Sequence, residues 1–383
     1  MTRIRTQSTV TDRRPVVDRL TERMAQEGLD VLVVQSKENI RYLTGHLIQS
    51  QELDMRHRTF LAFLGADGRC SLVASRSEVP EIESSTQGVD VFGYDEFSDD
   101  LTDVLRWVID DTGIGGGRMG IEEDSVTVQV ADRLREILAD VHGTMRPALH
   151  VLDAARAIKT APEISLMRRA ANSAVTAQKA LYDTVDATFT ERDIASFLVG
   201  HLFSAGADGY KTIQVAAGRR SRLANPTPQD IEVGEGQPIK IDLFPVFDGY
   251  LSDTGRTFSI GSAEPGLVYQ WSQAEDMLAQ LGAHIEPGMT GDAVWAYYVR
   301  LLASRGLEPA MKFLGHGLGL GLHEAPFIAP GSTELIEPGM VLALEPVTEH
   351  DGVGLHIENV YEVSDSGLVN LTEGYGKEYC VVR

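Results

Sequence analysis

Hydrophobic and polar positions alternate most clearly in the segment IKIDLFPVFDGYLSDTGRTFSI, residues 239–260. Isoleucine and leucine occupy every second position at its start, which is the period of a half-buried strand. Asp248 and Gly249 follow, and they predict a two-residue type I′ turn because such a turn needs a positive φ at both positions. We therefore expect a β-hairpin here.

The predicted hairpin places two aspartates on one face of the sheet. If Asp248 and Gly249 form the turn, Asp253 lies opposite Phe244, and Asp242 lies diagonally from Asp253. Diagonal neighbours lie about 7 Å apart, a separation that a metal ion or a shared proton can bridge. Because two carboxylates beside a buried strand are costly unless something pairs them, both aspartates are candidate site residues.

A second hairpin is predicted in residues 341–363, again around an Asp-Gly turn. In this register Glu345 and Glu358 face each other directly, within about 5.5 Å at Cβ. Like charges placed in this way are destabilising unless a cation lies between them. Pro346 lies inside the first strand and cannot donate to the ladder, so it indicates an edge or a bulge at this point.

Two histidines, His316 and His323, lie in the glycine-rich run GHGLGLGLHEAP. The glycines disfavour a regular helix and allow the backbone to approach a ligand closely. A single histidine is more often structural than a ligand. Four carboxylates with one imidazole, however, form a donor set suited to manganese, iron, cobalt or zinc. Two such ions about 3.5–4 Å apart can bridge and deprotonate a water molecule.

The remaining pattern predicts two domains. Residues 1–155 alternate strands and helices of the lengths found in a three-layer α/β domain, and a strand gives way to a helix at residues 150–155. Residues 156–383 begin with a long helix that has Pro162 in its first turn. A further helix is expected after Thr190, and strands with glycine-rich turns follow.

Composition narrows the class of protein. The chain has 383 residues and a formal net charge of −22, which argues against nucleic-acid binding because that leaves a basic footprint. The N-terminus lacks the apolar core of a signal peptide, and no apolar run is long enough to span a membrane. Cys70 and Cys380 are too few for a disulfide framework. We therefore expect a cytoplasmic enzyme without membrane or nucleic-acid partners.

These motifs, in this order, resemble the creatinase, prolidase and methionine aminopeptidase superfamily, whose fold is called pita-bread. DVLVVQS with NIRYLTG resembles its N-terminal domain, and ARAIKTAPEISLMRRAA resembles the start of its catalytic domain. The resemblance covers nearly the whole chain. It implies an α+β fold class, with a creatinase-like three-layer domain at 1–155 and a pita-bread catalytic domain at 156–383. It also implies a homodimer.

The resemblance further implies two divalent metal ions per chain, of manganese, cobalt, zinc or iron. Asp242 resembles the terminal aspartate on one metal, and Asp253 resembles the bridging aspartate. His316 resembles the single histidine ligand of the other metal. Glu345 resembles that metal's glutamate, which also acts as the base for the bridging water, and Glu358 resembles the bridging glutamate.

Residues around this ligand set are candidates for contacts with the substrate. His323, in His-Glu-x-Pro, resembles the histidine that contacts the substrate carbonyl and steadies the tetrahedral intermediate. Asn225 stands where many proline-specific members carry a substrate-side histidine, and His356 stands where many carry arginine. Gly255 replaces a threonine of the Asp-x-Thr-Arg-Thr run. Asn225 and His356 are therefore candidate substrate-binding residues that leave proline specificity open.

Several functions fit this pattern. The resemblance is closest to Xaa-Pro dipeptidases and aminopeptidases acting on short peptides. The alternative is a hydrolase or lyase for a small non-peptide C–N substrate, similar to ectoine hydrolase or creatinase. A binding protein with an inactive site is disfavoured because all five ligands are present. Asp253 and Asp365 each begin an Asp-(Ser/Thr)-Gly run typical of aspartic proteases, but the predicted helices contradict two all-β lobes.

Overall fold

The computed structural model describes residues 13–53, 55, 57–113 and 117–383. The chain divides into two compact units, of which the first ends at Arg156 and the second comprises Ala157–Arg383. Residues 1–12, which carry most of the segment read for a signal peptide, lie outside the described residues. Among the helices that are described, none has both the length and the apolar character needed to cross a bilayer.

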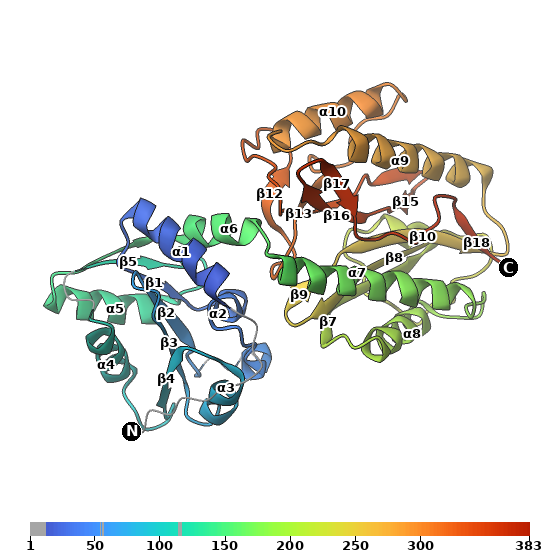
Figure 1. Ribbon diagram of the computed structural model, residues 1–383. Coiled ribbons are helices and arrows are strands. Elements are labelled where there is room, and N and C mark those ends of the chain that lie inside the picture. The colour runs from blue at the N-terminus through green and yellow to red at the C-terminus, as the bar shows by residue number, and fades with distance from the viewer. Residues whose placement is uncertain (1–12, 54, 56, 114–116) are drawn as a thin grey trace. The chain divides into compact units, whose positions relative to one another are not determined.

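The N-terminal unit is built on one six-stranded mixed sheet (Figure 1). Its strands are β1 (Val31–Val34), β2 (Leu61–Gly65), β3 (Cys70–Ser75), β4 (Val89–Tyr94), β5 (Arg118–Ile121) and β6 (Thr144–Pro147). They lie in the order β4-β3-β2-β1-β5-β6. The helices are α1 (Arg14–Glu27), α2 (Lys37–Thr44), α3 (Val79–Ser85), α4 (Leu101–Thr112), α5 (Val128–Asp140) and α6 (Leu149–Ala157), with a 3-10 segment η1 at Gln49–Leu53.

Alternate side chains of the central strand β1 face two helical layers. Val31 and Val33 pack with side chains of α4 and α5 in one buried cluster. Leu32 and Val34 are also fully buried, and the period of two turns them to the other face, where α2 contacts β2 and β3. The three-layer α/β arrangement is therefore confirmed. The strand expected near residue 150 is wrong, because β6 already ends at Pro147 and residues 150–155 are helical.

The C-terminal unit contains two five-stranded sheets and a short hairpin (Figure 1). The first sheet consists of β7 (Gly209–Ala217), β8 (Ile239–Phe247), β9 (Tyr250–Leu251), β10 (Thr254–Ile260) and β18 (Cys380–Val382). Its order is β18-β10-β8-β7, with β9 paired to β8. The helices α7 (Ala161–Tyr182) and α8 (Glu191–Ser204) pack on it in one buried cluster. A 3-10 segment, η2, covers Gly218–Arg222.

The second sheet has the order β12-β11-β13-β16-β17. Its strands are β11 (Gly315–Gly317), β12 (Glu324–Ile328), β13 (Val341–Leu344), β16 (Asn359–Ser364) and β17 (Gly367–Asn370), and the hairpin consists of β14 (Thr348–His350) and β15 (Val353–Leu355). The helices α9 (Pro265–His284) and α10 (Gly291–Ala303) pack on this sheet. Because β10 and β16 contact each other, the two sheets meet between the two helix pairs.

The predicted helix starts are confirmed at their caps. Thr190 caps α8 and accepts a hydrogen bond from the N–H of Asp193, whose carboxylate accepts one from the N–H of Thr190. This reciprocal capping box satisfies backbone donors that a helix N-terminus otherwise leaves free. Pro162 lies in the first turn of α7, where its missing N–H costs nothing.

The first predicted hairpin is confirmed. Asp248 and Gly249 have φ values of 49° and 83°, as a type I′ turn requires. The predicted register continues through β8 and β10, where Asp242 pairs with Gly255.

The second predicted hairpin is confirmed at its ends and wrong in its middle. Its Asp-Gly turn joins β14 to β15, and β13 pairs with β16 in the expected register. Between these ladders, residues 345–347 and 356–358 belong to no strand, so the direct ladder pairing of Glu345 with Glu358 is not formed. Pro346, which lacks the N–H that a ladder needs, lies in this gap.

Two glycines of the predicted ligand loop serve the sheet instead of a ligand. A Cβ at Gly315 would lie 2.1 Å from the carbonyl oxygen of Ala343, and one at Gly317 would lie 2.2 Å from that of Ala325. The close approach that this run permits is therefore to the neighbouring strands β13 and β12.

Candidate metal centre

Two aspartates reach the inner face of the first sheet from adjacent strands. Ile241 and Leu243 of β8 face the cluster formed with α7 and α8, so Asp242 between them faces the opposite side. Asp253 immediately precedes β10, two residues before Gly255, the ladder partner of Asp242. The two carboxylates therefore lie on the same face, and their residues are only 6% and 3% exposed.

Two glutamates come from the second sheet, at the gap in its hairpin. Glu345 follows β13, and its N–H donates to the carbonyl oxygen of Leu314 over 2.9 Å. Glu358 precedes β16, and its N–H donates to the carbonyl oxygen of Gly255 over 3.0 Å. This last hydrogen bond joins the second sheet to β10, which brings the glutamates to the aspartates.

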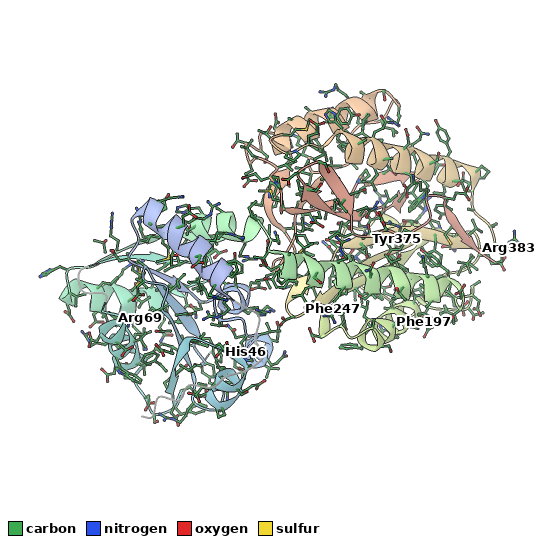
Figure 2. All side chains as sticks on the ribbon, in the orientation of Figure 1. His46, Arg69, Phe197, Phe247, Tyr375 and Arg383 are labelled. Carbon is green, nitrogen blue, oxygen red and sulfur yellow. The ribbon has the colours of Figure 1, made fainter. Side chains whose placement is uncertain are left out.

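Arg256 holds the junction of the two sheets. Its guanidinium donates to the carbonyl oxygen of Glu358 and to the side-chain oxygen of Asn359. It also lies 3.7 Å from the ring centroid of Tyr375, which is labelled in Figure 2. A buried guanidinium bound on several sides in this way fixes the backbone of Glu358 relative to Asp253.

His316 on β11 presents one ring nitrogen to the carboxylates. Its Nδ1 lies 2.8 Å from the carbonyl oxygen of Gly317. Because a carbonyl can only accept, Nδ1 carries the hydrogen and Nε2 keeps a free lone pair. Nε2 lies 3.6 Å from Oδ2 of Asp253 and 3.9 Å from Oε1 of Glu345. This is the tautomer and direction that a metal ligand needs.

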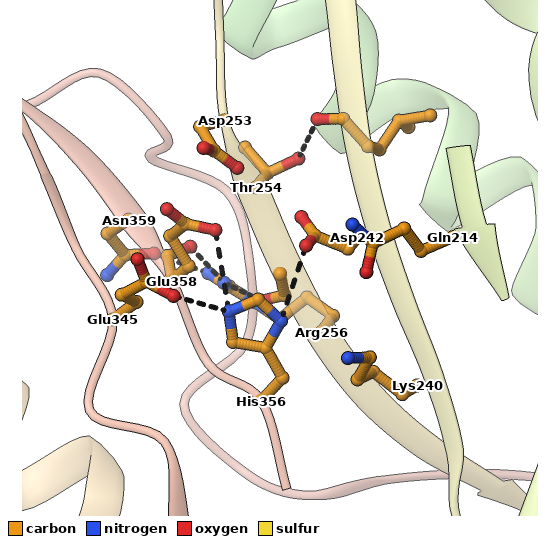
Figure 3. A network of polar contacts seen from close by, with 12 residues as sticks. Gln214, Lys240, Asp242, Asp253, Thr254, Arg256, Glu345, His356, Glu358 and Asn359 are labelled. Atoms are coloured by element: carbon orange, nitrogen blue, oxygen red, sulfur yellow. Dashed lines mark hydrogen bonds and ion pairs between the residues drawn. The ribbon is translucent and has the colours of Figure 1, made fainter. Parts of the chain in front are cut away.

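His356 lies between the carboxylates of the two sheets. Figure 3 shows its ring with Asp242 on one side and Glu345 and Glu358 on the other. Nδ1 lies 3.8 Å from Oδ2 of Asp242, and Nε2 lies 3.4 Å from Oε2 of Glu345 and 3.5 Å from Oε2 of Glu358. His356, which the sequence indicates as a candidate substrate-binding residue, therefore faces the acidic cluster.

The polar atoms of this cluster are suited to hold cations. Buried polar groups normally have hydrogen-bond partners, and those without one usually mark a bound ion or water. In the described part of the chain, several buried atoms of the cluster have no such partner: Asp242 Oδ1, Asp253 Oδ1, His316 Nε2, Glu358 Oε1 and both ring nitrogens of His356. Carboxylate and imidazole donors together fit divalent transition metals. The residues present therefore fit a metal centre.

Burial dominates the electrostatics of the cluster. It raises the pKa of Glu345 to about 7. Burial and then the neighbouring charge of Asp242 raise the pKa of Asp253 well above its usual value, and burial and the charge of Asp253 do the same for the pKa of Glu358. Such shifts on a group of carboxyls show that their charges are not compensated by the protein alone.

A cavity of about 440 Å³ opens over the cluster, within the range of small-ligand pockets. Asp242, Asp253, Glu345, His356 and Glu358 contribute to its lining. The cavity therefore gives a small substrate direct access to the candidate metal ligands.

His323 and Asn225 line the same cavity. His323 is exposed, and its ring stacks on that of His316 with centroids 4.0 Å apart. Its loop is held by Glu324, which accepts hydrogen bonds from Nζ of Lys159 over 3.0 Å and from the N–H of Gly321 over 2.7 Å. His323 is therefore positioned beside the cluster and in reach of a bound substrate.

Comparison with known proteins identifies the family. Residues 165–365, more than half of the chain, match Metallopeptidase family M24, and residues 17–158 match the Creatinase/Prolidase N-terminal domain. The chain belongs to metallopeptidase family M24. This M24 protein is therefore a metal-dependent hydrolase, and the expected pita-bread superfamily is confirmed.

Relatives and solved structures extend over almost the whole M24 chain. The Xaa-Pro dipeptidase of Lactobacillus helveticus is 26% identical over 366 residues, which cover 93% of this chain and 96% of that protein. The uncharacterized peptidase YqhT of Bacillus subtilis is 26% identical over 359 residues, or 93% and 97% of the two chains. The structure of the Xaa-Pro dipeptidase from Bacillus anthracis has a TM-score of 0.84 at 22% identity, covers 97% of this chain and 100% of that one, and shares the fold.

Lys240 is a cavity residue that the sequence reasoning missed. It is 6% exposed, and burial lowers the pKa of its amine. Its Nζ donates to the carbonyl oxygens of Leu223 and Ala224 over 2.7 and 3.1 Å, which ties down the loop before Asn225. The alternation of side chains along β8 could have identified Lys240 from the sequence. Alternate residues of a strand share a face, and Lys240 stands two residues before Asp242.

The metal-free M24 protein is expected to lose stability as the pH rises above about 6.5. The folded chain keeps protons on Glu345, Asp253 and Glu358, whose raised pKa values lie above those of the unfolded chain. Burial lowers the pKa of His316 to about 3 and that of His356 to about 4. These histidines make stability rise with pH, but only below about pH 6.5, which is the pKa of an imidazole in the unfolded chain. Above that pH the histidines no longer contribute, so the carboxyls make stability fall, until the pH reaches the alkaline range in which the buried amine of Lys240 loses its proton and opposes the fall.

Thermal unfolding of chelator-treated protein between pH 6.5 and 8.5 checks this expectation. The midpoint should fall with rising pH, and the fall should be smaller in a metal-loaded control because bound cations compensate the carboxylates. A midpoint of the chelated protein that stays constant or rises would contradict the assigned electrostatics.

Proposed function

We propose that this protein cleaves short peptides of the Xaa-Pro type, as a dipeptidase or aminopeptidase. The observation that carries the proposal is a cluster of four carboxylates that line a cavity of about 440 Å³, with the buried His316 behind them and His323 beside them. A cavity of this size favours small substrates over protein chains. The Lactobacillus helveticus relative is an Xaa-Pro dipeptidase, which supports proline in the second position of the substrate.

Asp242, Asp253, His316, Glu345 and Glu358 are the residues that we propose to hold two divalent ions. When bound, such ions polarise the scissile carbonyl and lower the pKa of water. The raised pKa of Glu345, about 7 through burial, suits a group that takes up and returns a proton near neutral pH. Glu345 accepts the proton of the attacking water and delivers it to the leaving nitrogen.

His323 is proposed to stabilise the oxyanion that develops on the substrate carbonyl. Its ring stacks on His316 and is exposed to the cavity, so that a ring N–H can reach a carbonyl oxygen bound at the cluster. Asn225 accepts a hydrogen bond from Nε2 of Gln214 over 2.9 Å. Its amide is therefore held in place and can orient the substrate.

Replacing His323 with alanine is expected to lower kcat by about 10²–10³-fold, because one oxyanion donor contributes about 2.7–4 kcal/mol to the transition state. Metal content should not change, since His323 is outside the proposed ligand set. The measurement is steady-state kinetics with metal analysis on the same samples. His284→Ala, which removes a histidine stacked on Tyr297 at the end of α9, is the matched control. Wild-type kcat in His323→Ala would exclude this role.

A second candidate function is hydrolysis of a small non-peptide amide, which Asn225 favours. An asparagine cannot titrate or become cationic as a histidine can, so a feature expected of proline-specific members is absent from this position. Lys240 adds a buried amine to the same cavity. Both features change how the cavity would recognise the charged ends of a substrate.

A turnover screen separates the two functions. The purified protein is loaded with manganese, cobalt, zinc or iron and assayed with Xaa-Pro dipeptides, longer Xaa-Pro peptides, matched Xaa-Ala peptides and small cyclic amidines and amides. We expect turnover of Xaa-Pro substrates with a preference over Xaa-Ala. Turnover confined to the non-peptide group would replace the proposal with the second candidate.

The identity of the metal, the oligomeric state and the location in the cell are three further predictions. The donor set accepts manganese, cobalt, zinc or iron, and we propose that the two ions are among these. The resemblance to the superfamily supports a homodimer, which analytical ultracentrifugation would test. Two free cysteines, Cys70 and Cys380, fit a reducing compartment and so support a cytoplasmic location.

A further inference from the structure

Two groups of side chains in the cluster have the same composition. Asp253, His316 and Glu358 offer one donor atom each, and so do Asp242, His356 and Glu358; within each group the donor atoms lie within 4.8 Å of one another. All of these residues are buried. Glu358 belongs to both groups, as a carboxylate that bridges two ions would.

We infer that His356 is a metal ligand, so that each of the two ions has an imidazole of its own. This inference rests on the proposed metal centre and adds a sixth ligand to its five. It assigns His356, with Asp242 and Glu358, to the ion that does not bind His316.

The distances around His356 fit a shared ion better than hydrogen bonds. Within its own group, Nε2 of His356 lies 3.5 Å from an oxygen of Glu358 and Nδ1 lies 3.8 Å from one of Asp242, beyond the usual 2.7–3.2 Å range of N–H···O bonds. Two ligands that each lie about 2.1 Å from one ion are separated by about 3.0–3.4 Å at octahedral or tetrahedral angles. The corresponding distances from His316, 3.6 and 3.9 Å, are similar.

Both nitrogens of His356 lack hydrogen-bond partners among the residues that the structure describes, although the residue is only 5% exposed. Its backbone, by contrast, is anchored. The N–H of His356 donates to Oγ1 of Thr257 over 2.9 Å, and that hydroxyl donates to the carbonyl oxygen of His356 over 3.2 Å. The backbone of His356 is thus held by β10, and the ring nitrogens are available to bind a metal ion.

Gly255 provides the space that the ring occupies. A Cβ at this position would lie 2.6 Å from Nδ1 and 2.7 Å from Nε2 of His356. Gly255 does not have a positive φ, so its backbone conformation does not require glycine. The two departures from the family pattern, histidine for arginine at 356 and glycine for threonine at 255, therefore form one arrangement.

The substitution changes what this position can do. A guanidinium has donors only and cannot bind a cation, whereas a neutral imidazole is a common ligand for zinc, cobalt and iron. A nitrogen donor on the second ion should therefore shift its preference towards these metals and away from magnesium, which prefers oxygen ligands.

The experiment is X-ray absorption spectroscopy of the full chain loaded with two equivalents of Co²⁺ or Zn²⁺. Scattering from the more distant ring atoms reports how many imidazoles bind each ion. We expect an average of one imidazole per ion in the wild type and one half per ion in His356→Phe. Competition with a chelator should show at least a tenfold loss of affinity for one of the two ions. His323→Phe is the matched control, because it replaces a ring in the same cavity that is not a proposed ligand.

Gly255→Ala gives an independent route if His356→Phe does not fold. It keeps all six side chains but places a methyl group where the ring lies, and the imidazole count should again fall towards one half. Equal counts in wild type and both variants, with two ions bound, would overturn the inference and leave the proposed function intact. Failure of the wild type to bind metal would overturn both.

Discussion

Asp253→Asn is expected to reduce turnover at least about 10³-fold. The substitution keeps the size of the side chain but removes the negative charge of the proposed bridging ligand, which is 3% exposed and faces Asp242 and Glu358. An amide cannot compensate two cations as a carboxylate does, so the metal pair is lost. Metal-assisted hydrolysis depends on several kcal/mol of charge stabilisation from the ions, and each 1.36 kcal/mol is a factor of ten.

The measurement for Asp253→Asn is kcat/KM together with metal content and thermal unfolding. Asp365→Asn is the matched control, because Asp365 begins the other Asp-(Ser/Thr)-Gly run but lies in the exposed turn between β16 and β17. It should keep wild-type turnover. Equal loss of activity in both variants would instead support the aspartic-protease interpretation, in which both aspartates act.

Glu345→Gln is expected to lower kcat by about 10²–10⁴-fold, the range that general acid–base catalysis contributes. Glutamine fills the same space after β13 and can still ligate through its oxygen, but it cannot accept the proton of the attacking water. KM should change much less than kcat, since proton transfer belongs to the transition state.

Steady-state kinetics at saturating metal, with metal analysis of the same samples, tests the Glu345 assignment. Glu337→Gln serves as the control, because Glu337 is an exposed glutamate just before the same strand. Full turnover in Glu345→Gln with two ions bound would show that another group is the base.

The aspartate hairpin could be predicted because its register is set locally. The Asp-Gly turn fixes which residues of β8 and β10 pair, and Asp242 and Asp253 then share a face without any knowledge of the rest of the fold. The resemblance to the superfamily supplied the remaining ligands in order. The structure brings all of these side chains into one cluster.

The middle of the second hairpin could not be predicted from the same rules. A register argument assumes a continuous ladder, and the ladder opens where Pro346 stands and where Glu358 turns to bond Gly255 on the other sheet. The position of His356 depends on this contact between sheets. It also depends on Gly255, a residue that is remote in sequence and becomes a neighbour only when the two sheets meet.

We propose that this chain folds four carboxylates and His316 around a pair of divalent ions. Metal analysis of protein purified without chelators, then loaded and desalted, tests it most directly. We predict two divalent ions per chain in the wild type. A content well below one ion per chain, in protein that circular dichroism shows to be folded, would contradict a metal centre at this cluster.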